Sequence, residues 1–379
     1  MARTPRPTLV PRSPQPLNLA PDFATRRAQD RGALAFPLDR LKRRGSSPLM
    51  ATNALPIRRI PRRPFLRHVA VITLGGSGLV GATRAQTAGA PVRKRKLTMD
   101  LACGSIGVSA NQLEAIELAH RFGFESVGAD GGYLAALPED KLAALLADLK
   151  AKNLVWGAAG LPVDFRGSQA TFDQGLGRLP AFAAGLRRAG VTRVGTWLSP
   201  AHDRLTYLQN FRQHTVRLRA VAQALQEHGV RLGIEYVGPK TSWTRGRYPF
   251  VHTMAEMKEL IAEISVKTVG FVLDSWHWYT AGETAADLQT LRPEDIVAVD
   301  LNDAPAGVPV DQQSDGRREL PAATGVIDLA TFLNALNTIG YDGPVRAEPF
   351  NQALNRLGKE EACAATAQAM RKAFALIQE

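Results

Sequence analysis

Eight short apolar runs, each followed by a segment of helical pattern, extend from Leu97 to the end of the chain and constrain its fold most strongly. The runs are LTMDLACG, FESVGAD, LVWGAAGL, VTRVGTWLS, RLGIEYVG, TVGFVLD, IVAVDLND and GPVRAEPF. Between them, segments such as NQLEAIELAHRFG and DLATFLNALNTIG place apolar residues at i, i+3, i+4 and i+7 and end at a glycine. Eight such units in about 280 residues predict a (β/α)8 TIM barrel.

A doubly wound open sheet is the competing architecture. Such a sheet places a glycine-rich loop for a dinucleotide or phosphate directly after its first strand. No such loop follows LTMDLACG, and the sequence GGSG at residues 75–78 lies upstream of all eight runs. The barrel is therefore the predicted fold of residues 97–379.

Four acidic residues of the second half lie where predicted strands end, one per run: Glu235, Asp274, Asp300 and Glu348. The carboxyl ends of barrel strands meet at one face of the barrel, where enzymes of this architecture carry their chemistry. A carboxylate is costly to bury alone, so several converging carboxylates imply a cation among them. The pattern predicts one metal site at the mouth of the barrel.

Strand alternation indicates which way these acids face. Gly233 and Glu235 share one face of their run, and Asp300 and Asn302 share one face of theirs, while the opposite faces are apolar. Because the apolar faces would pack on helices, the acids are expected to point into the barrel. Glu235 and Glu348 lie within their runs and are the strongest candidates for a metal-binding or catalytic role.

A histidine lies beside one of these acids. His277 follows Asp274 by three residues, and of the seven histidines it is the one that neighbours a candidate ligand. Asp303 and Asp315 also follow strands, and we interpret both as loop acids or helix caps.

Five motifs of this chain, in their order and spacing, resemble the xylose isomerase-like TIM barrel superfamily of sugar isomerases and epimerases. They are Glu235, the Asp-Ser-Trp-His box at 274–277, the strand VDLND, the segment RRELPAATGVIDL and the closing AEPF. The resemblance covers roughly residues 97–379 and implies the same barrel fold.

The resemblance implies one divalent ion, Mn2+ or Mg2+, held by a Glu, an Asp, a His and a second Glu from successive late strands. Carried over to this chain, the ligands are Glu235, Asp274, the residue at 300 and Glu348. Position 300 departs from the pattern, because Asp300 stands where a His is usual, and Asn302 is the alternative third ligand. An Asp there would make the site one unit more negative than a neutral His.

The resemblance also implies substrate contacts. His277 would contact a substrate hydroxyl and Arg318 would anchor a substrate oxygen, with Arg317 as the register alternative. The implied activity is isomerisation or epimerisation of a free sugar, keto-sugar or cyclitol through an enediolate that the metal stabilises. Glu235 and Glu348 would remove the proton and return it.

Two other functions remain open at this point. The first is a lyase or dehydratase acting on a 3-keto-glycoside or related sugar, because an active site of the same geometry can also catalyse elimination of a β-substituent. A non-catalytic sugar-binding accessory protein, with Asp300 marking a decayed site, is the second. The endonuclease branch of the superfamily fits poorly, because it uses several histidines and a basic face, and here only His277 approaches the acids.

The positive charge of the chain belongs to its first quarter. The whole chain carries +12, but residues 1–96 hold 20 Lys and Arg against 3 acids, which leaves 27 against 32 in the remaining 283 residues. The predicted barrel is mildly acidic and shows no basic stripe, which argues against a nucleic-acid partner. Cys103 and Cys363 lack metal-ligand spacing and are expected to be buried apolar residues.

The first 90 residues have the composition of a leader. Residues 1–49 are rich in Pro, Arg and Ser and are expected to be disordered or a mis-assigned extension, with Met50 as an alternative start. Residues 50–90 have the layout of a twin-arginine signal peptide: Arg62 and Arg63 precede an uncharged stretch, and small residues near Ala85 or Ala90 offer cleavage sites.

The uncharged stretch, VAVITLGGSGLVGA, is shorter than the ~20 residues that a spanning helix needs. No stable membrane span is therefore expected after processing. The leader predicts export of the folded protein, through the twin-arginine export machinery, to the periplasm or out of the cell.

Overall fold

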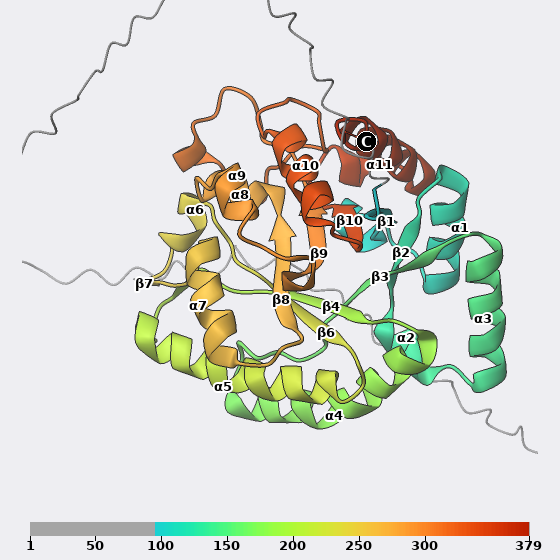
Figure 1. Cartoon of the computed structure of the whole chain (residues 1–379), viewed down its shortest axis with the longest axis horizontal. Helices are drawn as coiled ribbons and strands as arrows, with labels where there is room; N and C mark the ends of the chain where they lie inside the picture. Colours follow the sequence, from blue (N-terminus) through green and yellow to red (C-terminus); the bar gives the residue numbers. More distant parts are fainter. Residues whose placement is uncertain (1–94, 379) are drawn as a thin grey trace, which may run out of the picture. The chain divides into compact units, whose positions relative to one another are not determined.

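The computed structural model describes residues 95–378, in which eight parallel strands form a closed barrel (Figure 1). Around the barrel the strands follow the order β1-β10-β9-β8-β6-β4-β3-β2. Their bounds are β1 Thr98–Leu101, β2 Ser126–Ala129, β3 Val155–Gly160, β4 Arg193–Trp197, β6 Arg231–Glu235, β8 Val269–Asp274, β9 Ile296–Leu301 and β10 Pro344–Ala347. Each of the eight apolar runs supplies one of these strands, so the prediction of a TIM barrel is confirmed.

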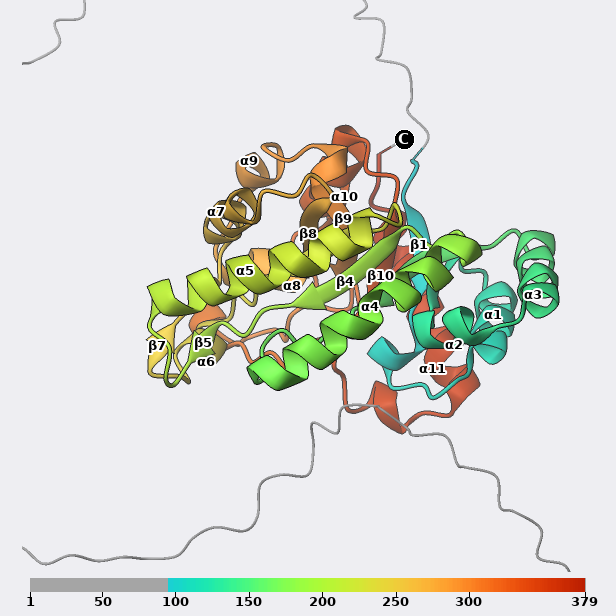
Figure 2. The ribbon, with the colours of Figure 1, turned by 90° about the horizontal axis from the view of Figure 1, so that it is seen from below.

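Helices cover the outside of the barrel, and α4 and α5 lie side by side along it (Figures 1 and 2). The longer helices are α1 Gln112–Phe122, α3 Glu139–Ala151, α4 Gln169–Ala189, α5 Tyr207–Gln226, α7 Met254–Ile264, α10 Leu329–Ile339 and α11 Lys359–Phe374. The shorter ones are α2 Gly131–Ala136, α6 Lys240–Trp243, α8 Ser275–Thr280 and α9 Ala285–Leu288. None of the described helices combines the length and apolar character that crossing a membrane requires.

Helix boundaries follow from local chemistry. Asn111 caps α1 by accepting the backbone N–H of Glu114, whose carboxylate in turn accepts the N–H of Asn111. The helix ends at Gly123, which adopts a left-handed conformation with φ of 73° that a residue without a Cβ reaches at low cost. Both boundaries agree with the helical segment predicted over these residues.

The loops contain a small antiparallel sheet in addition to the predicted elements. The two-residue strands β5 (Ala201–His202) and β7 (Tyr248–Pro249) pair antiparallel in the loops that follow β4 and β6.

Cys103 and Cys363 are buried free cysteines, as expected. The predicted extension at 1–49 and signal peptide at 50–90 lie outside the described residues.

A layer of small residues lies inside the barrel directly below the acidic strand ends. Gly233 of β6 pairs in register with Gly195 of β4 and Gly270 of β8. A Cβ on Gly233 would lie 2.9 Å from the side chains of both Val272 and Val297, so these valines fill the interior at this level. Glu235, two positions further along β6, therefore faces the space above this layer.

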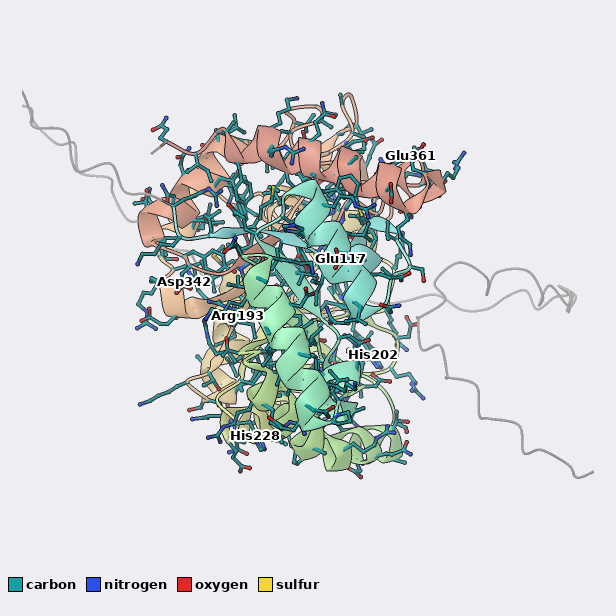
Figure 3. The ribbon with its side chains drawn as sticks, turned by 90° about the vertical axis from the view of Figure 1, so that its right-hand side faces the viewer. Glu117, Arg193, His202, His228, Asp342 and Glu361 are labelled. Carbon is teal, nitrogen blue, oxygen red and sulfur yellow. The ribbon has the colours of Figure 1, made fainter. Side chains whose placement is uncertain are left out.

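An ion pair lies at the opposite end of the barrel. Arg193 lies close to Asp342 at the amino ends of β4 and β10, with 2.8 Å between Nη2 and Oδ1 (Figure 3). Arg193 also donates a 2.9 Å hydrogen bond from Nη1 to the carbonyl of Val297. Polar groups at this end of a TIM barrel contribute to stability, while the chemistry belongs to the carboxyl ends.

The contact between α2 and α4 generates a prediction on stability. A Cβ on Gly185 of α4 would lie 2.4 Å from the Cα of Ala135, whereas a Cβ on Gly177 of the same helix would meet nothing within 4 Å. Gly185→Ala should lower the free energy of unfolding by ~1–3 kcal/mol because backbone must move. Gly177→Ala, the matched control, should raise it by ~0.5–1 kcal/mol. Denaturant titration measures both, and equal stability of the two variants would contradict the close approach.

Candidate active site

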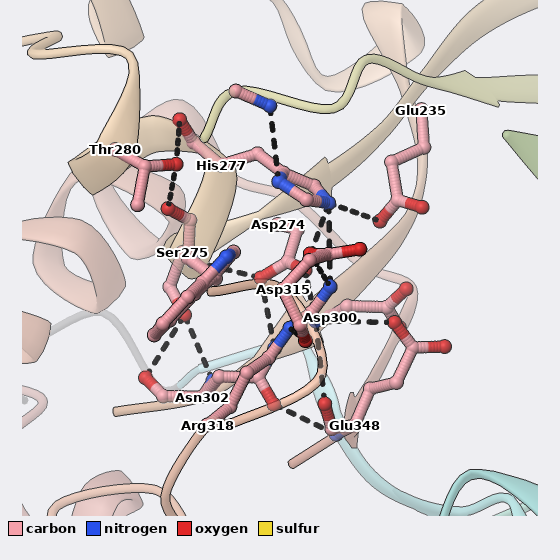
Figure 4. A network of polar contacts seen from close by, with 12 residues as sticks. Glu235, Asp274, Ser275, His277, Thr280, Asp300, Asn302, Asp315, Arg318 and Glu348 are labelled. Carbon is pink, nitrogen blue, oxygen red and sulfur yellow. Dashed lines mark hydrogen bonds and ion pairs between the residues drawn. The ribbon is translucent and has the colours of Figure 1, made fainter. Parts of the chain in front are cut away.

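All four acids predicted from the strand ends meet at the carboxyl end of the barrel (Figure 4). Glu235 ends β6, Asp274 ends β8, Asp300 lies in β9, and Glu348 follows β10 directly. Asp274 and Asp300 are paired in register on neighbouring strands. His277 and Arg318 lie in the same network, so the structure brings together every residue that the sequence placed in the site.

Asp274 is oriented by three hydrogen bonds. Its Oδ1 accepts the backbone N–H of Trp276 at 2.8 Å and Nδ2 of Asn302 at 2.9 Å, and its Oδ2 accepts Nη1 of Arg318 at 2.8 Å. The residue is completely buried. Burial raises the pKa of Asp274 to about 7, although Arg318 acts to lower it.

Asn302 connects two of the acids, and its side-chain oxygen is hydrogen-bonded rather than free. Its Nδ2 donates to Asp274, and its Oδ1 accepts the backbone N–H of Glu348 at 3.1 Å. Both functional groups of the amide are therefore engaged in holding Asp274 and the start of the loop after β10. Asn302 is therefore a link between these two acids.

Asp300 forms an ion pair that the sequence interpretation did not include. Arg346 of β10, the register neighbour of Asp300, donates from Nε to Oδ1 and from Nη2 to Oδ2, the latter at 2.9 Å. The extra negative charge expected from an Asp at this position is therefore offset by the guanidinium. Nη2 of Arg346 also lies 3.5 Å from Oε1 of Glu348.

Glu235 and Glu348 are the acids with the most strongly unfavourable surroundings for a charge. Burial raises the pKa of Glu235 well above its usual range, and repulsion from Glu348 and Asp300 raises it further. Burial, together with repulsion from Asp300, raises the pKa of Glu348 to about 8. A pKa of about 8 lets Glu348 exchange protons near neutral pH, as a general acid or base must.

His277 is a neutral imidazole whose Nε2 lies near two of the acids. Its Nδ1 accepts the backbone N–H of Gly238 at 3.2 Å, which places the ring proton on Nε2. Nε2 lies 3.8 Å from Oε1 of Glu235 and 3.7 Å from Oδ2 of Asp274. Burial, with the nearby Arg318, lowers the pKa of His277 to about 3, so the imidazole stays uncharged at neutral pH.

Arg318 is the cation at the centre of the network. Its Nη1 donates to Asp274 and lies 3.3 Å from Oε2 of Glu348, while its Nη2 donates to Oδ1 of Asp315 at 2.7 Å. Asp315 lies in a loop, as interpreted from the sequence, and its carboxylate in addition holds a site residue in position. The pKa of Asp315 is lowered by Arg318 despite its burial.

Two aromatic rings complete the surroundings of Arg318. The guanidinium carbon lies 5.5 Å from the ring centre of Trp276 and 4.6 Å from that of Phe350. Arg318 is 2% exposed, whereas Arg317 is exposed, so the register alternative is excluded. Asp303 accepts backbone N–H groups of residues 324, 325 and 327, which confirms it as a loop acid.

The donor set fits a divalent cation. Ligand atoms of Glu235, Asp300 and Glu348 lie within 4.8 Å of one another, and so do those of Glu235, Asp274 and His277. Oε1 of Glu235 is buried without a hydrogen-bond partner among the described residues. When ionised, these four carboxylates and Asp315 exceed the two guanidinium groups of Arg318 and Arg346 by three charges, and a divalent ion would offset two of them.

The sequence contained a usable signal for Arg346 but none for Asp315. Arg346 precedes Glu348 by two residues in the run GPVRAEPF, so strand alternation alone places both on one face. Asp315 lies in the long loop after β9, where no periodicity indicates which way a side chain points.

Comparison with known proteins agrees with this fold. Residues 116–373 match the family of xylose isomerase-like TIM barrels. The structure aligns with a xylose isomerase domain protein from Alicyclobacillus acidocaldarius with a TM-score of 0.63 and 34% identity, over 71% of this chain and 95% of that one. It aligns with an IolI protein carrying a zinc atom with a TM-score of 0.61, over 73% of this chain and 98% of that one; at 20% identity this likeness shows the fold alone.

Two enzymes are similar to shorter stretches of the sequence. An inosose isomerase from Bacillus subtilis strain 168 is 28% identical over 146 residues, which are 38% of this chain and 49% of the relative. A 3-dehydroshikimate dehydratase from Pseudomonas aeruginosa is 30% identical over 135 residues, 35% of this chain and 20% of the relative. The chain spans about half the length of the first relative and a fifth of the second.

The raised pKa values predict how stability depends on pH. In the unfolded chain Asp274 and Glu348 ionise near their ordinary values of 3.8 and 4.5, but in the folded protein only near 7 and 8. Their contribution to stability is therefore present at low pH and lost as pH rises through these folded values. The melting temperature of metal-free protein should fall between about pH 5 and about pH 8, and MnCl2 should reduce the fall because a cation stabilises the ionised form.

Glu348→Gln provides the matched comparison, since it removes one of these titrating groups. Its melting temperature should fall less over the same pH range than that of the parent protein. Equal falls in the two proteins, with no effect of MnCl2, would contradict the assigned electrostatics.

Proposed function

Because the chain belongs to the xylose isomerase-like TIM barrel family, we propose that it is a metal-dependent isomerase or epimerase of a free sugar, keto-sugar or cyclitol. The observation that carries this proposal is the pair Glu235 and Glu348. They come from β6 and β10, which β8 and β9 separate, so they flank the acid cluster from two sides. Burial raises the pKa of both, that of Glu348 to about 8, which supports proton exchange by this pair.

The cation in this proposal is Mn2+ or Mg2+, held by Glu235, Asp274, Asp300 and Glu348. The ligands are oxygen atoms, and no cysteine belongs to the set, which favours the harder divalent ions. When bound, such an ion supplies Lewis acidity that polarises a substrate carbonyl and stabilises negative charge on the adjacent oxygen.

The proton transfers are assigned to the two glutamates. One takes the proton from the carbon next to the carbonyl through a carboxylate oxygen, and the other delivers a proton to the neighbouring carbon or to the opposite face. Oε1 of Glu235, buried and without a hydrogen-bond partner among the described residues, is available for such a transfer. Ion pairs with Arg318 and Arg346 hold Glu348 in place.

His277 and Arg318 are assigned to substrate oxygens. Nε2 of His277 lies 3.8 Å from Oε1 of Glu235, and it would contact a substrate hydroxyl bound beside this glutamate. Arg318, held by Asp315 and its two aromatic neighbours, positions the carboxylates of Asp274 and Glu348 and donates to a substrate oxygen near them.

A lyase or dehydratase is the second candidate function, because a 3-dehydroshikimate dehydratase is among the relatives. Proton removal by Glu235 or Glu348 is the first step in either reaction. In the lyase the electron pair leaves with a β-substituent, whereas in the isomerase a proton is returned to carbon.

We also propose export of the folded protein. The support is the leader sequence, in which Arg62 and Arg63 precede an uncharged stretch and small-residue cleavage sites. A location outside the cytoplasm favours free sugars, glycosides and cyclitols over sugar phosphates as substrates.

Glu235→Gln and Glu348→Gln test the proposed chemistry. Each should lower kcat by ~10²-fold or more, because each removes an acid–base group. Each should also suppress deuterium incorporation from solvent into the substrate of a sugar panel that includes an inosose and D-fructose. Glu360→Gln removes an exposed carboxylate that pairs with Arg121 and serves as the control. Turnover near the parent rate in either variant would remove that glutamate from the mechanism.

Replacement of Arg62 and Arg63 by Lys tests the leader. Export through the twin-arginine machinery should stop, and the protein should accumulate in the cytoplasm with its leader intact. Cell fractionation with immunoblotting measures this, and unchanged export would refute the assignment.

A further inference from the structure

A hollow of about 340 Å3 opens beside the acid cluster, at the carboxyl ends of β1, β2 and β3. Small residues form much of its wall, among them Ala102, Gly104, Gly128 and Ala158. A Cβ added to Gly104 would meet nothing within 4 Å, so the space is open there. Its volume lies in the range of small-molecule sites, ~300 to 1,000 Å3.

Arg346 joins the hollow to the acid cluster. It lines the hollow, while its Nε and Nη2 are bound to Asp300 and its Nη2 lies 3.5 Å from Glu348. Its remaining group, Nη1, has no acceptor among residues 95–378. The side chain is 28% exposed, which leaves this donor open to a ligand.

The charges around Arg346 indicate which ligand chemistry the hollow accepts. Asp300 neutralises the guanidinium through both of its oxygens, and Glu348 lies close by. Asp100 of β1 pairs with Arg346 in register, and its buried Oδ1 has no hydrogen-bond partner among the described residues. Asp130 adds a further carboxylate to the wall of the hollow. An anion such as a phosphate ester would be repelled here, whereas a hydroxyl or carbonyl oxygen can accept from Nη1 without that cost.

We propose that this hollow is the subsite for the far end of a neutral polyol substrate, and that Arg346 anchors that end through Nη1. Asp300 is then the positioning residue that holds the guanidinium at the boundary between the hollow and the acids. Each oxygen of Asp300 can accept a second interaction, so this role is compatible with metal binding. The assignment of the reacting end to Glu235 and Glu348 rests on the proposed function.

Binding of defined probes to the full-length protein, with and without MnCl2, tests the subsite. Calorimetric titration would use scyllo-inosose and D-fructose as neutral probes and D-fructose 6-phosphate as the charged counterpart. Neutral probes should bind more tightly than the phosphate ester. Ala158→Leu, which fills the hollow without touching an ion pair, and Arg346→Met, which removes the donor, should each weaken neutral binding ~10-fold or more.

Several variants separate recognition from a general structural effect. Ala158→Ser keeps the hollow open, and Val155→Leu enlarges an exposed residue of the same strand, so both should bind like the parent. Arg346→Lys should restore part of the affinity. Because Arg346→Met leaves Asp300 buried and unpaired, the double variant Arg346→Met with Asp300→Asn keeps the test valid if the single variant fails to fold. Under turnover, Ala158→Leu should raise KM with little change in kcat.

The outcomes distinguish the subsite from the proposed function. Weakened binding in Ala158→Leu and Arg346→Met, without any turnover of a sugar by the parent, would retain the subsite and refute the isomerase. Turnover that neither variant changes would refute the subsite and leave the isomerase standing. A parent protein that binds no neutral probe, or that prefers the phosphate ester, would overturn the subsite directly.

Discussion

The burial of four carboxylates at one end of the barrel is the constraint on which the rest of the site depends. Closing eight parallel strands brings Glu235, Asp274, Asp300 and Glu348 into one space, and isolated negative charges there would be strongly unfavourable. The chain offsets part of this charge with Arg318 and Arg346, each bound to more than one acid. Burial, together with the charge that remains, raises the pKa of the glutamates, and that charge would attract a divalent ion.

The two arginines have different surroundings, and this difference organises the site. Arg318 is fully buried between two aromatic rings and bound to Asp315. Arg346 is partly exposed and lies between the acids and the hollow over β1 to β3. Arg318 therefore maintains the geometry of the carboxylates, while Arg346 is placed to meet a ligand. The reacting end and the far end of a substrate would thus be bound by different groups.

Much of the fold and of the acid cluster could be predicted from the sequence, because both depend on strand periodicity. The alternation of apolar runs with helical segments predicted eight strands, and the position of each acid within its run predicted that Glu235 and Asp300 face inward. The same rule applied to the last run would have found Arg346. Contacts made across loops could not be found this way, because the bond from Asp315 to Arg318 depends on the path of a segment without periodicity.

Asn302 shows a related limit of sequence reasoning. Its position two residues after Asp300 placed it correctly near the acids, but an amide can act as a metal ligand or as a link between neighbours. Only its actual partners, Asp274 and the backbone of Glu348, distinguish the two roles. Residue type and spacing identify the members of a site more readily than they identify what each member does.

Anomalous X-ray diffraction from crystals grown with MnCl2 tests the central claim most directly. The account predicts one manganese peak within bonding distance of Glu235 and Glu348, with Asp274 and Asp300 completing the oxygen ligands and Asn302 still bound to Asp274. Absence of a peak among these carboxylates at saturating Mn2+, or a peak at a different place in the barrel, would contradict it.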